Sequence, residues 1–250
     1  MQVVVDSLLT TYERMGSGRV VVFLHGWGDG MASSRVLRKE LSRAYDVIAL
    51  DLPGFGGTQT PPAAWGLDGY VRFVAHFLKK IGAGHVYCLM GHSNGGAMLI
   101  RGLANGTLQA DRAVLMASAG IRTPKSFRNR MLKVAAKTAK VFMKPLSRSV
   151  QQKMRVKAYG AIGSDYLVAP QLRESFTQIV SEDVRGDAVQ LIMPTLLIYG
   201  EADADTPVWY GELYHELMVD STLVILPSAG HFVYLDRPDD VVARCKEFLA

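Results

Sequence analysis

The chain has 250 residues, of which 49% are hydrophobic and 20% charged, with a formal net charge of +5. This length suits one α/β domain with an insertion, and the composition is typical of a globular protein rather than a disordered chain. Apolar runs such as 20–24 are far shorter than the roughly 20 residues of a membrane-spanning helix. Because no basic segment followed by a long apolar stretch opens the chain, the sequence favours a cytoplasmic protein.

Short apolar runs alternate with helical patterns along most of the chain. The predicted strands are 3–5, 8–13, 20–24, 45–50, 86–90, 112–116, 195–199 and 222–226. The predicted helices are 33–44, 67–81, 95–105, 207–217 and 238–249. Continuous apolar strands separated by helices are typical of an α/β fold with a mostly parallel sheet and helices on both faces. Such sheets bind ligands beyond the carboxyl ends of their strands. Cys88 falls in a predicted strand and Cys245 in a predicted helix, so both are expected to be reduced and buried.

The segment GHSNGG, residues 91–96, links a predicted strand directly to a predicted helix. Such a turn strains the residue at its apex and crowds the residues two positions before and after it. Gly91 and Gly95 relieve this crowding, so the sequence predicts a nucleophile elbow with Ser93 at the apex. The N-terminus of the following helix favours negative charge at that point.

A serine hydroxyl needs a neighbouring base, and His231 is the best candidate among the six histidines. It lies in a loop after the predicted strand 222–226, at the expected edge of the sheet, whereas the others are expected to be surface or packing residues. The base in turn needs a carboxylate that orients it. The loop after the predicted strand 195–199 offers Glu201, Asp203 and Asp205, and spacing alone does not choose among them.

Several motifs in order along the chain resemble those of α/β-hydrolase-fold serine hydrolases. They are FLHGWGDG at 23–30, DLPGFGGT at 51–58, GHSNGG at 91–96, GEADADTP at 200–207 and AGHF at 229–232. The resemblance implies that the acid is Asp203, because the family's G-x-x-D-x-x-x-P pattern aligns with Gly200 and Pro207. It also implies an oxyanion hole formed by the main-chain N–H groups of Trp27 and Asn94. A serine at the elbow argues against the dehalogenase and epoxide-hydrolase branches, while Asp51 and Gly54 to Gly57 are expected to have structural roles in turns.

The resemblance further implies a helical cap over the active site. We expect a core at 1–120 and 191–250 and an inserted cap at 121–190. Residues 121–160 contain twelve Lys or Arg and no Asp or Glu, which leaves 16 basic and 23 acidic residues elsewhere. A predicted cap helix with one apolar and one basic face would pack on the core, and weak contact with an anionic membrane surface is a second hypothesis. Nucleic acid is disfavoured as a partner because no known binding motif is present.

The sequence therefore predicts a serine esterase that cleaves carboxylic esters with Ser93, His231 and Asp203. No cofactor and no metal are expected, and Trp27 and Met31 are expected to help shape the substrate pocket. Three alternatives remain open. The first is a C–C hydrolase of ring-cleavage products, and the second is a lactonase or perhydrolase. Both would use the same three residues. The third, from a different class, is a ligand-binding receptor on the same fold. The sequence does not specify the substrate or the oligomeric state.

Overall fold

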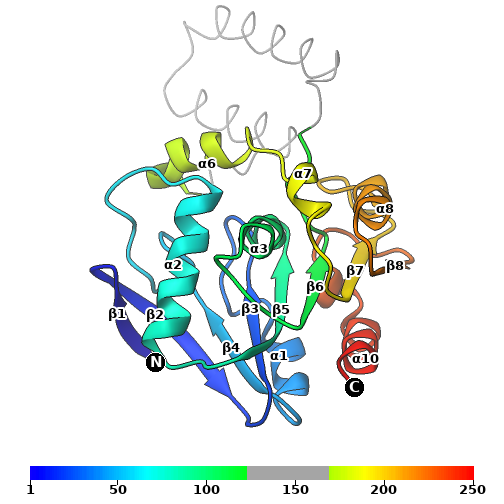
Figure 1. Ribbon diagram of the computed structural model, residues 1–250, viewed down its shortest axis with the longest axis horizontal. Helices are drawn as coiled ribbons and strands as arrows, with labels where there is room; N and C mark the ends of the chain where they lie inside the picture. Colours follow the sequence, from blue (N-terminus) through cyan, green and yellow to red (C-terminus); the bar gives the residue numbers. More distant parts are fainter. Residues whose placement is uncertain (123–168) are drawn as a thin grey trace, which may run out of the picture.

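The computed structural model describes residues 1–122 and 169–250 (Figure 1). Its centre is an eight-stranded sheet in the order β1-β2-β4-β3-β5-β6-β7-β8. The strands are β1 (Gln2–Val5), β2 (Leu8–Met15), β3 (Val20–Leu24), β4 (Asp46–Leu50), β5 (Val86–His92), β6 (Arg112–Met116), β7 (Thr195–Gly200) and β8 (Ser221–Leu226). Strands β3 to β8 are parallel to one another, and β1 and β2 form an antiparallel edge next to β4. The predicted strands and the mostly parallel sheet are confirmed.

The sheet separates two hydrophobic clusters, one on each face. Strand β3 serves both, since Val22 and Leu24 belong to one cluster and Val21 and Phe23 to the other. Full burial of such a side chain contributes about 1.5–3 kcal/mol, so a strand buried on both faces is strongly held. Helices α2 (Leu67–Lys80) and α3 (Asn94–Ala104) supply the first cluster, and α1 (Arg35–Leu41) and α10 (Pro238–Leu249) the second (Figure 1).

The remaining helices include one predicted element and four short ones. Helix α8 (Val208–Leu217) was expected, and the five predicted helices end within three residues of their observed bounds. The short helices are η2 (Pro170–Leu172), α6 (Arg173–Ile179), α7 (Arg185–Ala188) and α9 (Val233–Asp236). None spans enough residues to produce the repeating apolar pattern from which a helix is predicted.

The carboxyl ends of four neighbouring strands lie level at one edge of the sheet. The last residue of β5, His92, pairs with Met116 at the end of β6. Gly200, at the end of β7, pairs with Leu226 at the end of β8. The loops that follow these strands therefore leave the sheet side by side, and they are the loops that carry Ser93, Asp203 and His231.

Residues 169–190, which make up most of the described part of the predicted cap, pack against the core. Val184 is fully buried, and its N–H donates to the carbonyl of Gly120 at 2.8 Å. Arg101 of α3 binds Asp187 at 2.7 Å and Glu182 at 3.1 Å, which ties the α6–α7 segment to the core. The basic helix and most of the predicted insertion fall in residues 123–168, outside the described residues.

Asp51 joins two turns near the sheet edge. One carboxylate oxygen accepts the N–H of Met31 at 2.8 Å, and the other accepts the N–H of Gly57 at 2.9 Å. A β-carbon on Gly56, where φ is +51°, would lie 2.1 Å from this carboxylate. The structural role expected for these turn residues is confirmed.

Both cysteines are free and buried, as expected. Burial raises the pKa of the Cys245 thiol to about 12 and that of Cys88 well above its ordinary value, so both remain protonated at neutral pH. In residues 1–122 and 169–250, no helix has the length and apolar character needed to cross a bilayer.

Candidate active site

Ser93 occupies a strained turn between β5 and α3. Its φ of 52° and ψ of −116° place it in a region that non-glycine residues rarely adopt. A β-carbon on Gly91 would lie 2.7 Å from the nitrogen of Gly96, and one on Gly95 would lie 2.4 Å from the carbonyl oxygen of Leu24. Glycine is therefore required at both positions. The prediction that these glycines relieve crowding around Ser93 is confirmed.

Hydrogen bonds on both sides hold this turn in place. The N–H of Ser93 donates to the carbonyl of Met116, and the N–H of Ala119 donates to the carbonyl of Ser93, both at 3.0 Å. The strain at Ser93 is thus maintained by β6 and by the segment that follows it. The backbone presents the serine side chain in a fixed direction above the sheet.

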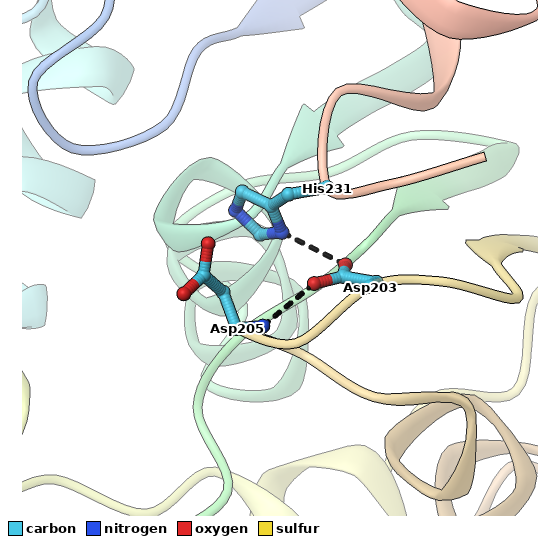
Figure 2. A group of neighbouring side chains, drawn as sticks. All are labelled: Asp203, Asp205 and His231. Atoms are coloured by element: carbon cyan, nitrogen blue, oxygen red, sulfur yellow. Dashed lines mark hydrogen bonds and ion pairs between the residues drawn. The ribbon is translucent and has the colours of Figure 1, made fainter. Parts of the chain in front are cut away.

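His231 and Asp203 form a hydrogen-bonded pair (Figure 2), and the carbonyl of His231 contacts His92, the residue before Ser93. Nδ1 of His231 lies 2.8 Å from Oδ2 of Asp203, whose side chain is fully buried. Oδ1 of Asp203 accepts the N–H groups of Asp205 at 2.8 Å and Thr206 at 2.9 Å. The hydroxyl of Thr206 lies 2.7 Å from Oδ2. The structure therefore pairs His231 with Asp203 rather than with Glu201 or Asp205.

Asp203 is held in its charged form by these contacts. Burial alone would raise the pKa of its carboxyl. The hydrogen bond and charge of His231 and the donors of Thr206 together have the larger, opposite effect, so the pKa lies below its ordinary value. The ionised carboxylate accepts the proton on Nδ1 of His231. Nε2 of the ring is then left with a lone pair, which is the form that a general base requires.

His92 connects the serine turn to the loop of His231. Its Nε2–H donates to the main-chain carbonyl of His231 at 3.0 Å, and the two rings lie 4.8 Å apart. Burial, followed by the charge of His231, lowers the pKa of His92 to about 3, so this ring is neutral. His92 was expected to be a surface or packing residue. Its role depends on a contact across 139 positions, which no local pattern reveals.

Replacing His92 with leucine should flatten the pH dependence of stability. Because the folded-state pKa is about 3 and the ordinary value 6.5, the unfolded chain binds a proton that folded His92 does not, and stability is lost as pH falls from 6.5 toward 3. His92→Leu should remove this share of the slope, at most about 1.4 kcal/mol per pH unit. Urea unfolding at several pH values measures the slope.

The matched control for this experiment is His92→Gln, which also lacks the titrating ring but keeps an N–H donor for the carbonyl of His231. It should show the same flattened slope as His92→Leu and a higher stability at neutral pH. A wild-type slope in both variants would contradict the assignment of a buried, neutral His92.

The predicted oxyanion donors lie close to Ser93. A β-carbon on Gly26 would be 3.0 Å from Cβ of Ser93, so the loop that leads to Trp27 passes directly beside the serine. Asn94 begins α3, where the first N–H groups have no partner inside the helix. In the part of the chain that the structure describes, neither N–H donates to a main-chain carbonyl in a turn or loop. Both groups are thus able to bind a developing negative charge.

A cavity of about 490 Å³ opens at Ser93. Its wall is mostly apolar, and the apolar and aromatic residues are Trp27, Leu67, Ala97, Ala119, Ile121, Phe176, Ile179, Val180 and Tyr210. Ser93, Asn94 and Thr206 line its catalytic side, and its charged residues are Arg122, Glu182 and Asp205. Trp27 packs against Phe176 of α6, with ring centres 5.3 Å apart. The cavity thus joins the elbow to the described part of the predicted cap.

Sequence comparison agrees with this geometry. The sequence pattern of the alpha/beta hydrolase family matches residues 21–244. The chain belongs to the alpha/beta hydrolase family. The resemblance drawn from the motifs is confirmed.

Two named relatives align with nearly the whole of this alpha/beta hydrolase. The 2-hydroxy-6-oxo-6-(2'-aminophenyl)hexa-2,4-dienoic acid hydrolase of Metapseudomonas resinovorans is 27% identical over 260 residues, which cover 96% of this chain and 87% of that protein. The pimeloyl-(acyl-carrier protein) methyl ester esterase of Aeromonas salmonicida is 26% identical over 255 residues, which cover 95% and 98%. A crystal structure of a membrane phospholipase A has a TM-score of 0.79, 24% identity, and coverage of 100% of this chain and 84% of its own. That last similarity is one of fold.

One predicted pocket residue of the hydrolase lies elsewhere. Met31 is absent from the cavity wall, whereas Trp27 is part of it. The N–H of Met31 is held by Asp51, and its side chain packs beside the cluster on the opposite face of the sheet. Nearness to Trp27 in sequence was misleading because Gly28, with φ of 73°, turns the chain between them.

Asp203, Asp205 and His231 also form the group of described residues that could hold a metal, with ligand atoms within 4.8 Å of one another. However, Nδ1 of His231 and both oxygens of Asp203 already take part in the hydrogen bonds given above. A metal ion would have to displace the bond that orients the imidazole. The arrangement fits proton transfer better than metal binding.

Proposed function

We propose that this hydrolase is a serine esterase that cleaves carboxylic esters through an acyl-enzyme. Ser93 attacks the ester carbonyl as His231 takes its proton, and Asp203 orients and stabilises the imidazolium. The N–H groups of Trp27 and Asn94 stabilise the tetrahedral oxyanion. His231 then protonates the leaving alcohol, and a water molecule that His231 activates releases the acid.

The observation that carries this proposal is the His231–Asp203 hydrogen bond of 2.8 Å, made to a fully buried carboxylate next to the strained serine turn. The pair supplies the base, and the strain at Ser93 presents the nucleophile. The hydrogen bond of His92 with the carbonyl of His231 connects the serine turn to the loop that carries the base. This arrangement lowers the entropic cost of bringing nucleophile and base together.

The apolar wall of the cavity supports an ester as the substrate. Apolar side chains such as Ile121, Phe176 and Ile179 suit an acyl chain, which needs no polar partner along its length. The relative from Aeromonas salmonicida is named as a methyl ester esterase. The cavity wall favours an ester with an apolar acyl part, and the relative's name favours an ester as the substrate class.

A second candidate function is the hydrolysis of a C–C bond in a carboxylated ring-cleavage product. It is favoured by Arg122, a cation in the cavity wall that could bind a substrate carboxylate. The relative from Metapseudomonas resinovorans is named as a dienoic acid hydrolase. The same serine, histidine and aspartate would serve this reaction.

Initial rates on two substrate sets test the choice. One set is p-nitrophenyl esters of increasing acyl length, and the other is vinylogous diketone acids of the ring-cleavage type. We expect turnover of the esters, with an optimum chain length set by the cavity, and loss of that turnover after treatment with a serine-directed phosphonate. Turnover of the diketone acids without the esters would establish the C–C hydrolase instead. Binding without turnover of either set would favour a receptor.

A further inference from the structure

A second carboxylate lies beside His231 on the cavity side. Asp205 is exposed and lines the cavity, and one of its oxygens is within 4.8 Å of a ring nitrogen of His231 and of a carboxylate oxygen of Asp203. Figure 2 shows this carboxylate on the side of the imidazole turned away from Asp203. The triad as proposed makes no use of it.

The position of Asp205 is fixed by its own backbone. Its N–H donates to Oδ1 of Asp203 at 2.8 Å, and the next residue, Thr206, donates to the same oxygen at 2.9 Å. The backbone at residue 205 is therefore fixed, and its exposed carboxylate lies within 4.8 Å of a ring nitrogen of His231. A carboxylate is thus placed next to the base.

The charge of Asp205 is not neutralised by a nearby described group. Within residues 1–122 and 169–250, no group donates a hydrogen bond to its carboxylate and no cation forms an ion pair with it. The other acid of the cavity wall, Glu182, differs, because it binds Arg101 at 3.1 Å and accepts the N–H of Leu67 at 2.9 Å. Arg122 also lines the cavity, and its main-chain N–H donates to a carboxylate oxygen of Asp183 at 3.2 Å.

The proposed reaction decides which part of a substrate would meet Asp205. The imidazolium of His231 must protonate the leaving group, so the leaving alcohol lies next to the ring. The acyl chain instead extends along the apolar wall. A carboxylate at the ring therefore faces the alcohol part of the ester.

We infer that Asp205 selects the leaving group, favouring esters of cationic amino alcohols over esters of neutral or anionic alcohols. This inference rests on the proposed function of Ser93 and His231. The effect expected is about fivefold in kcat/KM between a cationic and a neutral isostere, which is the size of a partly exposed charge pair. Added salt should reduce the preference, because such a pair is screened.

The test compares a choline ester with the neohexyl ester of the same acid, in which a tert-butyl group replaces the trimethylammonium group. In Asp205→Asn, the ratio of kcat/KM for the choline ester to that for the neohexyl ester should fall about fivefold and lose its dependence on salt. The ratio cancels any general loss of activity in the variant. The matched control is Glu201→Gln, since Glu201 is an exposed acid on the same loop that binds the N–H of Ser228 at 3.0 Å. Its ratio should equal that of the wild type, and an unchanged ratio in Asp205→Asn would overturn the inference.

A second readout separates this inference from the proposed esterase function. Methylphosphonates with choline or neohexyl leaving groups should label Ser93, and mass spectrometry follows the rate. In this step the Oγ–P bond forms, the P–O bond to the alcohol breaks, and the serine proton passes through His231 to the alcohol. A preference for the choline phosphonate that disappears in Asp205→Asn supports the role of Asp205 even when esters prove to be poor substrates. Equal labelling rates for the two reagents in the wild type would overturn it even in an active esterase.

Discussion

Replacing Ser93 with alanine should lower kcat on an ester by at least about 10⁴-fold, because the variant can form no acyl-enzyme. Ser93 holds its strained φ of 52° only because β6 and the segment after it fix the turn. Alanine fits the same backbone, so the fold and the cavity should persist. The loss should appear in kcat rather than in KM, because the removed hydroxyl acts in the chemical steps.

Initial rates and a thermal unfolding curve, measured side by side on both proteins, check this result. Wild-type enzyme quenched during turnover should also carry the acyl group on the peptide that contains Ser93. The matched control is Ser118→Ala, since Ser118 is a buried serine near the elbow, where a β-carbon on Gly96 would lie 2.4 Å from its hydroxyl oxygen. A Ser93→Ala enzyme with substantial ester turnover would contradict the assignment of the nucleophile.

Most of the fold could be predicted because its strands are continuous apolar runs. Strand β3 is buried along its whole length, and the run VVVFL shows this directly. The turn at Ser93 could also be predicted, since Gly91 and Gly95 are required by contacts within the same short segment and with β3. Asp203 and His231 followed from their positions after strands, together with the family pattern.

The parts that could not be predicted depend on contacts between distant segments. The bond from His92 to the loop of His231 and the packing of α6 against Trp27 join positions far apart in the chain. Met31 was placed in the pocket because it is close to Trp27 in sequence, yet one glycine turn carries it to the other face of the sheet. Helix α9 follows His231 after one residue and is only four residues long, too short to show a period.

Asp203→Asn should lower kcat/KM by about 10⁴-fold, and the surrounding hydrogen bonds give the reason. Oδ1 of residue 203 must accept the N–H groups of Asp205 and Thr206. An asparagine therefore places its amide NH₂ at the position of Oδ2, where it donates to Nδ1 of His231. The ring is then forced to carry its proton on Nε2 and offers no lone pair to Ser93.

Asp205→Asn provides the comparison for this prediction, because it removes a neighbouring charge without altering the Asp203–His231 bond. Its loss of kcat/KM on a neutral ester should be far smaller than that of Asp203→Asn. The two variants also differ in stability at low pH. Since the pKa of folded Asp203 lies below its ordinary value, this carboxylate contributes stability that is present above its unfolded-state pKa and lost as pH falls through its folded-state pKa. Asp203→Asn should lack this contribution, so its unfolding free energy should fall less steeply in acid. If Asp205→Asn were the more damaging change to kcat/KM, Asp205 rather than Asp203 would be the acid that orients the base.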